Sequence, residues 1–411
     1  MLDIRFIREN AELVDEKAKA KGYKVDIKDV LEKNRIRNEK LRTRENLKSQ
    51  LNKISGNKKP SEEEITQARA LKVRLEKARE EFRKADDIDF KLQREIPNVF
   101  SDDTPLGGED KNKEIKTWGD AKEGKTKDHM MWGTERGLID FEAGAKVAGN
   151  KFYFIKASLV ELELAILQFA LAEVKKRGFF LMGVPHMVNS RVLEGAGFSA
   201  KGDEKQIYKV EDEDLNLIAT AEIPLTGFFA DEVMPSEWLP SKMAAWSPAY
   251  RMEGGAYGKH NRGLFRTHQF NKVELYVLCK PDESEAQHKE LLKLEEEICQ
   301  ALEIPYRVVQ IAAGDLGAPA YKKYDVEYWS PAEGAYRELM SCSNATDYQA
   351  RRLNIRYKTG DGTNEFVHTL NATAAAASRM MIAIIENFQD EDGKVAIPKA
   401  LQPYMHGQTE L

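Results

Sequence analysis

The chain has 411 residues, of which 42% are hydrophobic and 32% are charged, and its formal net charge at pH 7 is −5. These values are ordinary for a globular protein of two or three domains. Its three cysteines, Cys279, Cys299 and Cys342, are too widely spaced for a disulfide framework or a CxxC metal site, which favours a reducing, cytoplasmic compartment.

The N-terminus and the most apolar stretch both argue against secretion and against a membrane partner. Residues 1–9 carry charges where a signal peptide needs an unbroken apolar run. Residues 372–385 are shorter than the roughly 20 residues of a membrane span and contain Arg379. We therefore expect residues 372–385 to form a buried helix.

Residues 35–95 are basic and have helical periodicity. They contain 18 lysines and arginines and 12 acids, a net charge of +6 in a chain of −5. In the second half, apolar residues recur every three or four positions, at Ala68, Leu71, Leu75, Ala78, Phe82 and Ala85. This is the spacing of a coiled-coil seam. A break at Ser55-Gly56-Asn57 and a capping box at Ser61 predict an antiparallel helical hairpin.

The tip of this predicted hairpin is its most basic part. Between residues 46 and 61 there is no acid, and the lysines are Lys48, Lys53, Lys58 and Lys59. Each lysine alone would most simply be a solvated surface charge. The hairpin nevertheless carries a net positive charge while the rest of the chain is net negative, and this contrast favours a nucleic-acid partner. We expect residues 1–100 to form this arm, residues 101–124 a linker, and residues 125–411 a second domain.

The second domain alternates helical and β patterns. Helices are expected at 159–176, 283–302 and 374–387, and strands at 151–154, 217–223, 273–278, 306–311, 326–329 and 367–370. No GxGxxG or GxxxxGK[ST] element follows a predicted strand, so neither a dinucleotide-binding fold nor a P-loop is supported. If ATP binds here, arginines, an aromatic ring and a metal ion would have to hold it.

Residues 247–274 combine three arginines, two carboxylates and four glycines in one strand, loop, strand unit. On the second strand Phe270 and Glu274 share a face and lie roughly 13 Å apart. That separation suits an aromatic platform for a base at one end and a carboxylate for an ammonium group at the other. The alternative is a surface hairpin with ordinary charges.

Five motifs, in the same order along the chain, resemble the seryl-tRNA synthetase family of class II aminoacyl-tRNA synthetases. They lie at residues 220–226, 251–274, 338–344, 347–357 and 370–379, and the resemblance extends from residue 1 to residue 405. It implies an α+β protein with an N-terminal antiparallel coiled-coil arm and an antiparallel class II β-sheet flanked by helices. Residues 161–184 resemble the family's dimer motif and imply a homodimer, although an apolar helix there could equally be core.

The resemblance implies a serine–tRNA ligase that activates L-serine with ATP and Mg²⁺ and transfers it to serine tRNA. In the family the arm grips the long variable arm of that tRNA, and here Lys48, Lys53, Lys58 and Lys59 would contact it. A paralogue that delivers the activated amino acid to a carrier protein is an alternative, but such a protein would normally lack the arm. A catalytically inactive binding module is the third reading.

The resemblance also implies the site residues. Those for serine are Thr220, Ala221, Glu222, Arg251, Glu274, Asn371 and Thr373. Those for ATP are Arg251, Met252, Glu253, Thr267, His268, Gln269, Phe270, Glu338, Leu339, Met340, Ser341 and Arg379. Arg251 and Arg379 would be catalytic, and Glu338 and Ser341 would bind Mg²⁺. From the residues alone, Thr220 and Glu222 are more simply surface residues on one face of a strand, and Thr373 could be a helix N-cap.

Two local features qualify these assignments. Glu338 and Ser341 are three residues apart, which does not place them on one face of a regular strand, so we expect a bulge or a strand end there. Residues 258–263 read Gly-Lys-His-Asn-Arg-Gly, where the family usually has Gly-Arg-Asp-Thr-Arg-Gly. The histidines and cysteines form no ligand cluster, so zinc is not expected.

Overall fold

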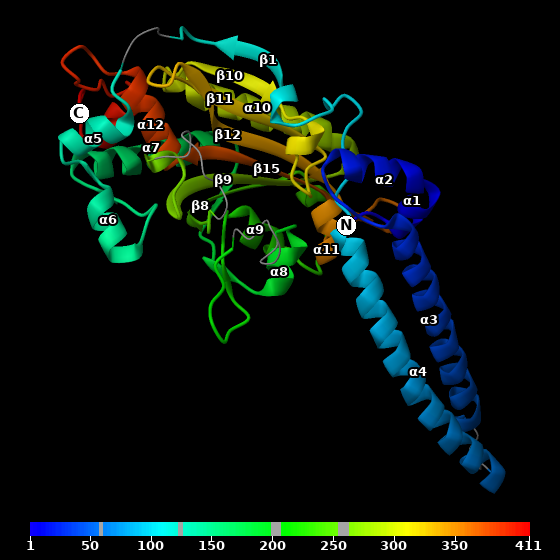
Figure 1. The fold of residues 1–411 in the computed structure, drawn as a ribbon. Coiled ribbons are helices and arrows are strands. Elements are labelled where there is room, and N and C mark those ends of the chain that lie inside the picture. The colour runs from blue at the N-terminus through cyan, green and yellow to red at the C-terminus, as the bar shows by residue number, and fades with distance from the viewer. Residues whose placement is uncertain (57–60, 122–125, 199–206, 254–262) are drawn as a thin grey trace. The chain divides into compact units, whose positions relative to one another are not determined.

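A computed structural model describes residues 1–56, 61–121, 126–198, 207–253 and 263–411. The chain forms two compact units, Met1–Val99 and Phe100–Leu411, whose elements are drawn in Figure 1. Within the described ranges, no helix has both the length and the apolar character that a membrane span needs.

The first unit contains four helices: α1 (Ile4–Glu9), α2 (Ala11–Ala20), α3 (Ile27–Ser55) and α4 (Glu62–Glu95). The long α3 and α4 pair antiparallel, as the sequence predicts. Leu71, Leu75 and Ala78 of α4 form a buried seam with Leu47 of α3. The predicted capping box is present, because the Ser61 hydroxyl accepts the Glu64 N–H and the Glu64 carboxylate accepts the Ser61 N–H.

Charged pairs fix the register of this hairpin beside the narrow apolar seam. Arg37 Nε lies 2.7 Å from Asp86 Oδ1, and Lys40 Nζ lies 2.8 Å from Glu81 Oε2. Lys48 and Lys53 are exposed on α3 near the tip. The other two predicted lysines, Lys58 and Lys59, lie outside the described residues.

The second unit is built on an eight-stranded sheet in the order β1-β10-β11-β12-β15-β9-β8-β4. Its strands are β1 (Lys113–Trp118), β4 (Phe180–Met182), β8 (Ser241–Tyr250), β9 (Gln269–Cys279), β10 (Tyr306–Gln310), β11 (Lys322–Ser330), β12 (Ala335–Thr346) and β15 (His368–Ala376). Neighbouring strands are antiparallel except for β4 and β8. The expected antiparallel class II sheet is therefore confirmed.

Helices cover the two faces of the sheet unequally, as Figure 1 shows. On one face α7 (Ser158–Lys176), α10 (Ser284–Ala301) and α12 (Ala377–Asn387) form the main core with the β9 residues Val273, Leu275 and Val277. On the other face α9 (Glu222–Phe228) and α11 (Tyr348–Leu353) cover Tyr276 and Leu278. Phe270 and Glu274 lie on this second face by strand alternation, which positions the site described below.

The remaining elements are short. They are α5 (His129–Glu135), β2 (Ile139–Asp140), α6 (Phe141–Ala148), β3 (Phe154–Ile155), β5 (Met187–Val188), α8 (Ser190–Gly195), β6 (Asn216–Leu217), β7 (Val233–Met234), β13 (Arg356–Lys358) and β14 (Asn364–Phe366).

Four predicted segments differ from the structure. The strand expected at 151–154 is present only as the two-residue β3, Phe154–Ile155. Residues 101–124, expected as a linker, contribute β1, whose residues are all exposed and whose apolar residues, Ile115 and Trp118, do not alternate with polar ones. The strand expected at 217–223 ends at Leu217, and Glu222 begins α9, where Pro224 is tolerated in the first helical turn. Residues 372–376 belong to β15, because a strand buried on both faces has the same unbroken apolar run as a buried helix.

The buried seam of the hairpin generates the first prediction. Leu75 is 4% exposed and Val73 is 73% exposed on the same helix. We expect Leu75→Ala to destabilise the α3–α4 pair by about 2 to 4 kcal/mol, since it removes buried apolar atoms and leaves a cavity. Val73→Ala is the matched control and should have little effect. Hydrogen exchange of the α3 and α4 amides measures both, and equal exchange in the two variants would contradict the seam.

Candidate functional site

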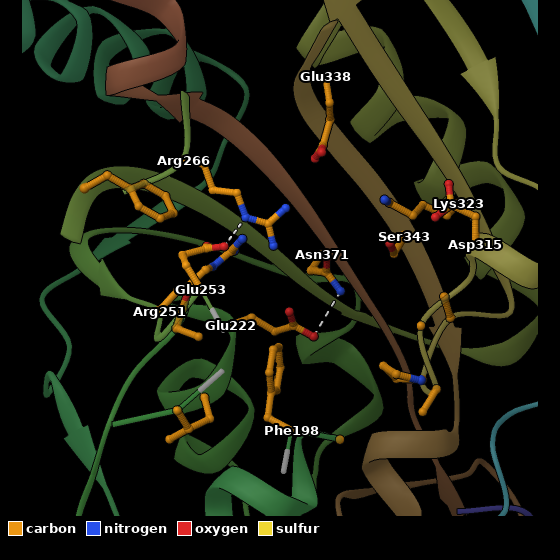
Figure 2. Close-up of a pocket in the computed structure, with 18 of the residues that line it drawn as sticks. Phe198, Glu222, Arg251, Glu253, Arg266, Asp315, Lys323, Glu338, Ser343 and Asn371 are labelled. Carbon is orange, nitrogen blue, oxygen red and sulfur yellow. Dashed lines mark hydrogen bonds and ion pairs between the residues drawn. The ribbon is translucent and has the colours of Figure 1, made fainter. Parts of the chain in front are cut away.

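A cavity of about 690 Å³ opens on the site face of the sheet, between β9, β12 and β15 and the loops that follow β8 and precede β9. Figure 2 shows its lining residues pointing inward from these elements. Many of the predicted site residues line it, namely Glu222, Arg251, Glu253, Thr267, Phe270, Glu338, Asn371 and Arg379. Glu222 and Arg379, which are 157 positions apart in sequence, therefore meet in one cavity.

Two arginines and two aromatic rings form one part of the cavity. The guanidinium carbon of Arg251 lies 5.2 Å from the ring centre of Phe270, and that of Arg379 lies 4.7 Å from Phe265. Burial and the positive charge of Arg379 lower the pKa of Arg251. Two cations that repel each other, flanked by aromatic faces, suit a ligand with several negative charges and a flat base.

Glu338 provides the negative partner for Arg379, with Oε1 3.1 Å from the guanidinium Nη1. Burial opposes the ionisation of Glu338, but the charges of Arg379 and Lys323 outweigh it and lower the pKa to about 2. Lys323, on β11, is itself paired with Asp325 at 3.0 Å. The carboxylate of Glu338 is therefore ionised at neutral pH.

The bulge predicted between Glu338 and Ser341 is confirmed. Glu338 pairs with Glu327 and Met340 with Val326, which leaves Leu339 as an extra residue in β12. This extra residue brings Glu338 and Ser341 to the same face of the strand. The side chains of Leu339 and Met340 are both buried in the main core.

A second ion pair holds the start of the loop that leaves β8. The carboxylate of Glu253 pairs with the guanidinium of Arg266, and both side chains line the cavity (Figure 2). Glu253 has a φ of 46°, a left-handed conformation that is uncommon for a residue with a side chain. Its backbone carbonyl accepts a hydrogen bond from Lys151 Nζ at 3.2 Å. The end of β8 is thus fixed by both side-chain and backbone contacts.

Buried carboxylates form another part of the site. Glu222 is 6% exposed, and its Oε1 accepts a hydrogen bond from Asn371 Nδ2 at 3.0 Å (Figure 2). Glu274 is 1% exposed and forms an ion pair with Lys272. Burial and the negative charge of Glu274 raise the pKa of Glu222 to about 7, and burial also raises the pKa of Glu274. Two carboxylates that share one lysine favour an additional cation.

The other predicted residues surround the cavity rather than line it. Thr220 and Ala221 precede α9, and the Thr220 hydroxyl accepts the Glu222 N–H at 3.2 Å. Thr373 lies in β15 opposite Glu274, not at a helix N-cap. His268 Nδ1 contacts the Arg251 carbonyl at 2.9 Å.

Met252 lies in the loop after β8, between Arg251 and Glu253, and Gln269 is exposed at the start of β9. For these two residues the sequence offered only their place within residues 251–274, the segment that resembles a family motif. Their roles stay predictions.

The structure adds residues to which the sequence assigned no role. Lys323, Asp315 and Arg266 line the cavity. Gln349, within the motif at residues 347–357, donates a hydrogen bond from Nε2 to Glu222 Oε1 at 2.6 Å. Lys323, Asp325 and Glu327 occupy alternate positions of β11, a signal that could have placed Lys323 on a site face. Among the residues that the structure describes, no group of three or more His, Cys, Asp or Glu is arranged to hold a metal ion.

Two protein-family models match the chain. The seryl-tRNA synthetase N-terminal domain matches residues 1–100, and the tRNA synthetase class II core domain (G, H, P, S and T) matches residues 208–388. The chain is 46% identical to the serine–tRNA ligase of Rubrobacter xylanophilus and 44% identical to that of Dictyoglomus turgidum. Each alignment covers 98% of this chain and 98% of the relative.

Solved structures give the same result. The fold is similar to the crystal structure of seryl-tRNA synthetase from Pyrococcus horikoshii complexed with ATP, with a TM-score of 0.90 and 38% identity over 100% of this chain and 99% of that one. It is also similar to the cytoplasmic serine–tRNA ligase of Naegleria fowleri in complex with AMP, with a TM-score of 0.85 and 31% identity over 100% and 98% of the two chains.

Proposed function

The chain belongs to the seryl-tRNA synthetase family, and we propose that its cavity carries out the family's reaction, the ATP-dependent ligation of L-serine to tRNA. One observation carries this proposal: a single cavity contains the buried carboxylate of Glu222 and, near it, two arginines that lie over aromatic rings, Arg251 over Phe270 and Arg379 over Phe265. An amino acid needs the first environment for its ammonium group. ATP needs the second for its phosphates and its base. The relatives give no support to the alternative, transfer to a carrier protein.

In the first step, the serine carboxylate attacks the α-phosphate of ATP in line. A bond forms between a carboxylate oxygen and phosphorus, the bond to the bridging oxygen breaks, and pyrophosphate leaves. Arg251, near the serine end, neutralises the carboxylate and the α-phosphate, while Arg379 neutralises the leaving pyrophosphate. The ammonium group of serine binds beside Glu222 and Glu274, with Asn371 directed to the hydroxyl group. Phe270 stacks on the adenine.

In the second step, a ribose hydroxyl of the terminal tRNA adenosine attacks the carbonyl carbon of seryl-adenylate, and AMP leaves. The proton of the hydroxyl goes to the leaving phosphate or to water. No residue of the chain forms a covalent intermediate, because the attacking groups in the two steps belong to serine and to the tRNA. The cavity holds the adenylate by the same contacts as in the first step.

In this proposal Glu338, which lines the cavity, and Ser341 would hold a magnesium ion. Both offer oxygen ligands from one face of β12, and the low pKa keeps Glu338 ionised. When bound, Mg²⁺ supplies positive charge to the phosphate oxygens of ATP. The absence of zinc expected from the sequence stays a prediction, as does the cytoplasmic location.

We further propose that residues 1–100 act as the tRNA-binding arm and residues 125–411 as the catalytic domain. Lys48 and Lys53 are exposed near the tip of a hairpin that has little apolar surface of its own. A basic rod of this kind can contact phosphates and 2′-hydroxyls of a long variable arm without reading base sequence.

A homodimer is supported by exposed apolar residues within and next to residues 161–184, the segment that resembles the family's dimer motif. Phe180 of the edge strand β4 is 71% exposed, and Val160 and Leu164 of α7 are also exposed. An edge strand with large apolar side chains is a natural pairing surface. The dimer would cover both the strand edge and the helix.

The central test is pyrophosphate exchange with a panel of amino acids, followed by transfer to total tRNA. We expect serine, with ATP and Mg²⁺, to drive exchange without tRNA, because the carboxylate and arginine ends lie in one unit of the chain. Threonine, proline and histidine are the controls. Faster exchange with any of these three would contradict the substrate assignment.

A second prediction concerns the arm. Neutralising Lys48, Lys53, Lys58 and Lys59 to glutamine should leave serine-dependent exchange unchanged and weaken tRNA binding. If each lysine meets one phosphate, the log-log salt slope of tRNA binding falls by roughly 3, at about 0.7 to 0.9 per contact. Glutamine substitution of Lys113 and Lys116 on β1 is the matched control. An unchanged slope in the four-lysine variant would remove these residues from the tRNA contact.

A third prediction concerns assembly. Light scattering at micromolar concentration should give a mass near twice the 46.7 kDa of one chain. Phe180→Glu should reduce that mass, because it places a charge on the exposed edge strand, whereas Phe154→Glu, at another exposed aromatic residue, should not. A monomeric mass for the unaltered protein would contradict the dimer.

A further inference from the structure

Gln349 lies on α11 and is fully buried, yet its side-chain amide forms four hydrogen bonds. Nε2 is 2.6 Å from Glu222 Oε1 and 2.9 Å from the Ala196 carbonyl oxygen. Oε1 is 2.6 Å from Thr369 Oγ1 and 3.2 Å from the Tyr276 hydroxyl. An amide has two donor hydrogens and two acceptor lone pairs, so every position is used.

The chemistry of the partners fixes which way this amide points. A backbone carbonyl accepts hydrogen bonds only, and so does an ionised carboxylate, so Nε2 must face Ala196 and Glu222. Thr369 and Tyr276 carry hydroxyl hydrogens, so Oε1 must face them. A flipped amide would put an oxygen against the carboxylate of Glu222. The orientation of Gln349 is therefore determined by its surroundings.

Gln349 in turn restrains Glu222. Glu222 Oε1 accepts hydrogen bonds from both Gln349 Nε2 and Asn371 Nδ2. This leaves Glu222 Oε2 as the oxygen for a ligand in the cavity. The backbone of Glu222 is held as well, because its carbonyl accepts the Thr226 hydroxyl at 2.7 Å and its N–H donates to Thr220. Rotation of the carboxylate away from the cavity would break the two bonds to Oε1.

We propose that Gln349 is a positioning residue of the serine site: it holds the carboxylate of Glu222 in the orientation that receives the ammonium group of serine. The inference rests on the proposed function and adds to it a residue that does not line the cavity. Gln349 acts on the substrate only through Glu222.

The charges around Glu222 give this role a pH signature. Burial and Glu274 on β9 raise the pKa of Glu222 to about 7, while the bond from Gln349 and the charges of Lys272 and Arg251 lower it. Without the amide donor the pKa of Glu222 rises further. Protonated Glu222 has no charge for an ammonium group, so serine binding should be lost at neutral pH and recovered as the pH is raised.

The test measures kcat and KM for serine and for ATP in pyrophosphate exchange, from pH 6 to about 8.5, with the full-length protein. Gln349→Met keeps the length of the side chain and removes the donor. We expect the KM for serine to rise about tenfold or more at pH 7, as for a lost hydrogen bond to a charged group, with the KM for ATP within about twofold. The acidic limb of kcat/KM for serine should move to higher pH.

Tyr276→Phe is the matched control. It removes one hydroxyl from the Oε1 side of Gln349 and leaves the bond between Nε2 and Glu222 in place. We expect a change in the serine KM of about threefold or less and no shift of the acidic limb. If Tyr276→Phe shifts the acidic limb of kcat/KM as much as Gln349→Met does, the effect comes from a general loss of packing around Gln349, and the proposal is wrong.

Gln349→Glu is the second variant and has the shape of the native residue. It places a carboxyl group beside that of Glu222, so the pair should retain a proton and serine binding should require a still higher pH. An unchanged acidic limb in this variant, or an equal rise in the KM for serine and ATP in Gln349→Met, would overturn the positioning role. Failure of the proposed function is a separate outcome, because the unaltered protein would then show no serine-dependent exchange.

Discussion

The site depends on charged side chains that are gathered in one cavity beside the central sheet and stabilised there by ion pairs. Glu338 pairs with Arg379, and Glu253 pairs with Arg266. Removing an ion from water costs several kcal/mol, so an isolated charge at this depth would change its protonation state or disrupt the local packing. Pairing keeps both signs of charge in place before a ligand arrives. Serine and ATP bring the same two signs, so each end of the ligand pair meets a matching environment.

Irregularities in the strands give these partners their directions. In β12 the extra residue Leu339 rotates Glu338 onto the face of Ser341, and in β15 a second register shift follows Thr373. In a regular strand the side chains alternate strictly between the two faces. Without the extra residue, Glu338 and Ser341 would therefore point to opposite faces of the sheet. The sheet supplies a rigid frame, and the bulges adjust side chains within it. Substitutions that alter the bulges would therefore act on the site without touching a ligand.

The two units of the chain use different means of stability. The second unit has a large apolar core between the sheet and α7, α10 and α12. The hairpin of α3 and α4 has only a narrow seam, supplemented by pairs such as Arg37–Asp86 and by the capping box at Ser61. A narrow seam leaves most of each helix surface polar, which is compatible with a nucleic-acid partner. The catalytic cavity lies wholly within residues of the second unit.

The sequence by itself determined what is encoded locally. Spacing predicted the seam of the hairpin, the Ser61 cap identified the start of α4, and strand alternation placed Phe270 and Glu274 on one face of β9. The three-residue interval between Glu338 and Ser341 was sufficient to predict a bulge, which the register of β12 confirms.

Only the tertiary structure decided which side chains meet. Gln349 contacts Glu222 across 127 positions of sequence, and Asn371 contacts it across 149, distances at which no local pattern carries information. The start of α9 at Glu222 and the strand β1 were also invisible, because a buried helix start resembles a buried strand and a polar edge strand resembles a linker. Periodicity reports which face of an element is buried, whereas hydrogen-bond partners depend on how separate elements pack, and that is settled only by the fold.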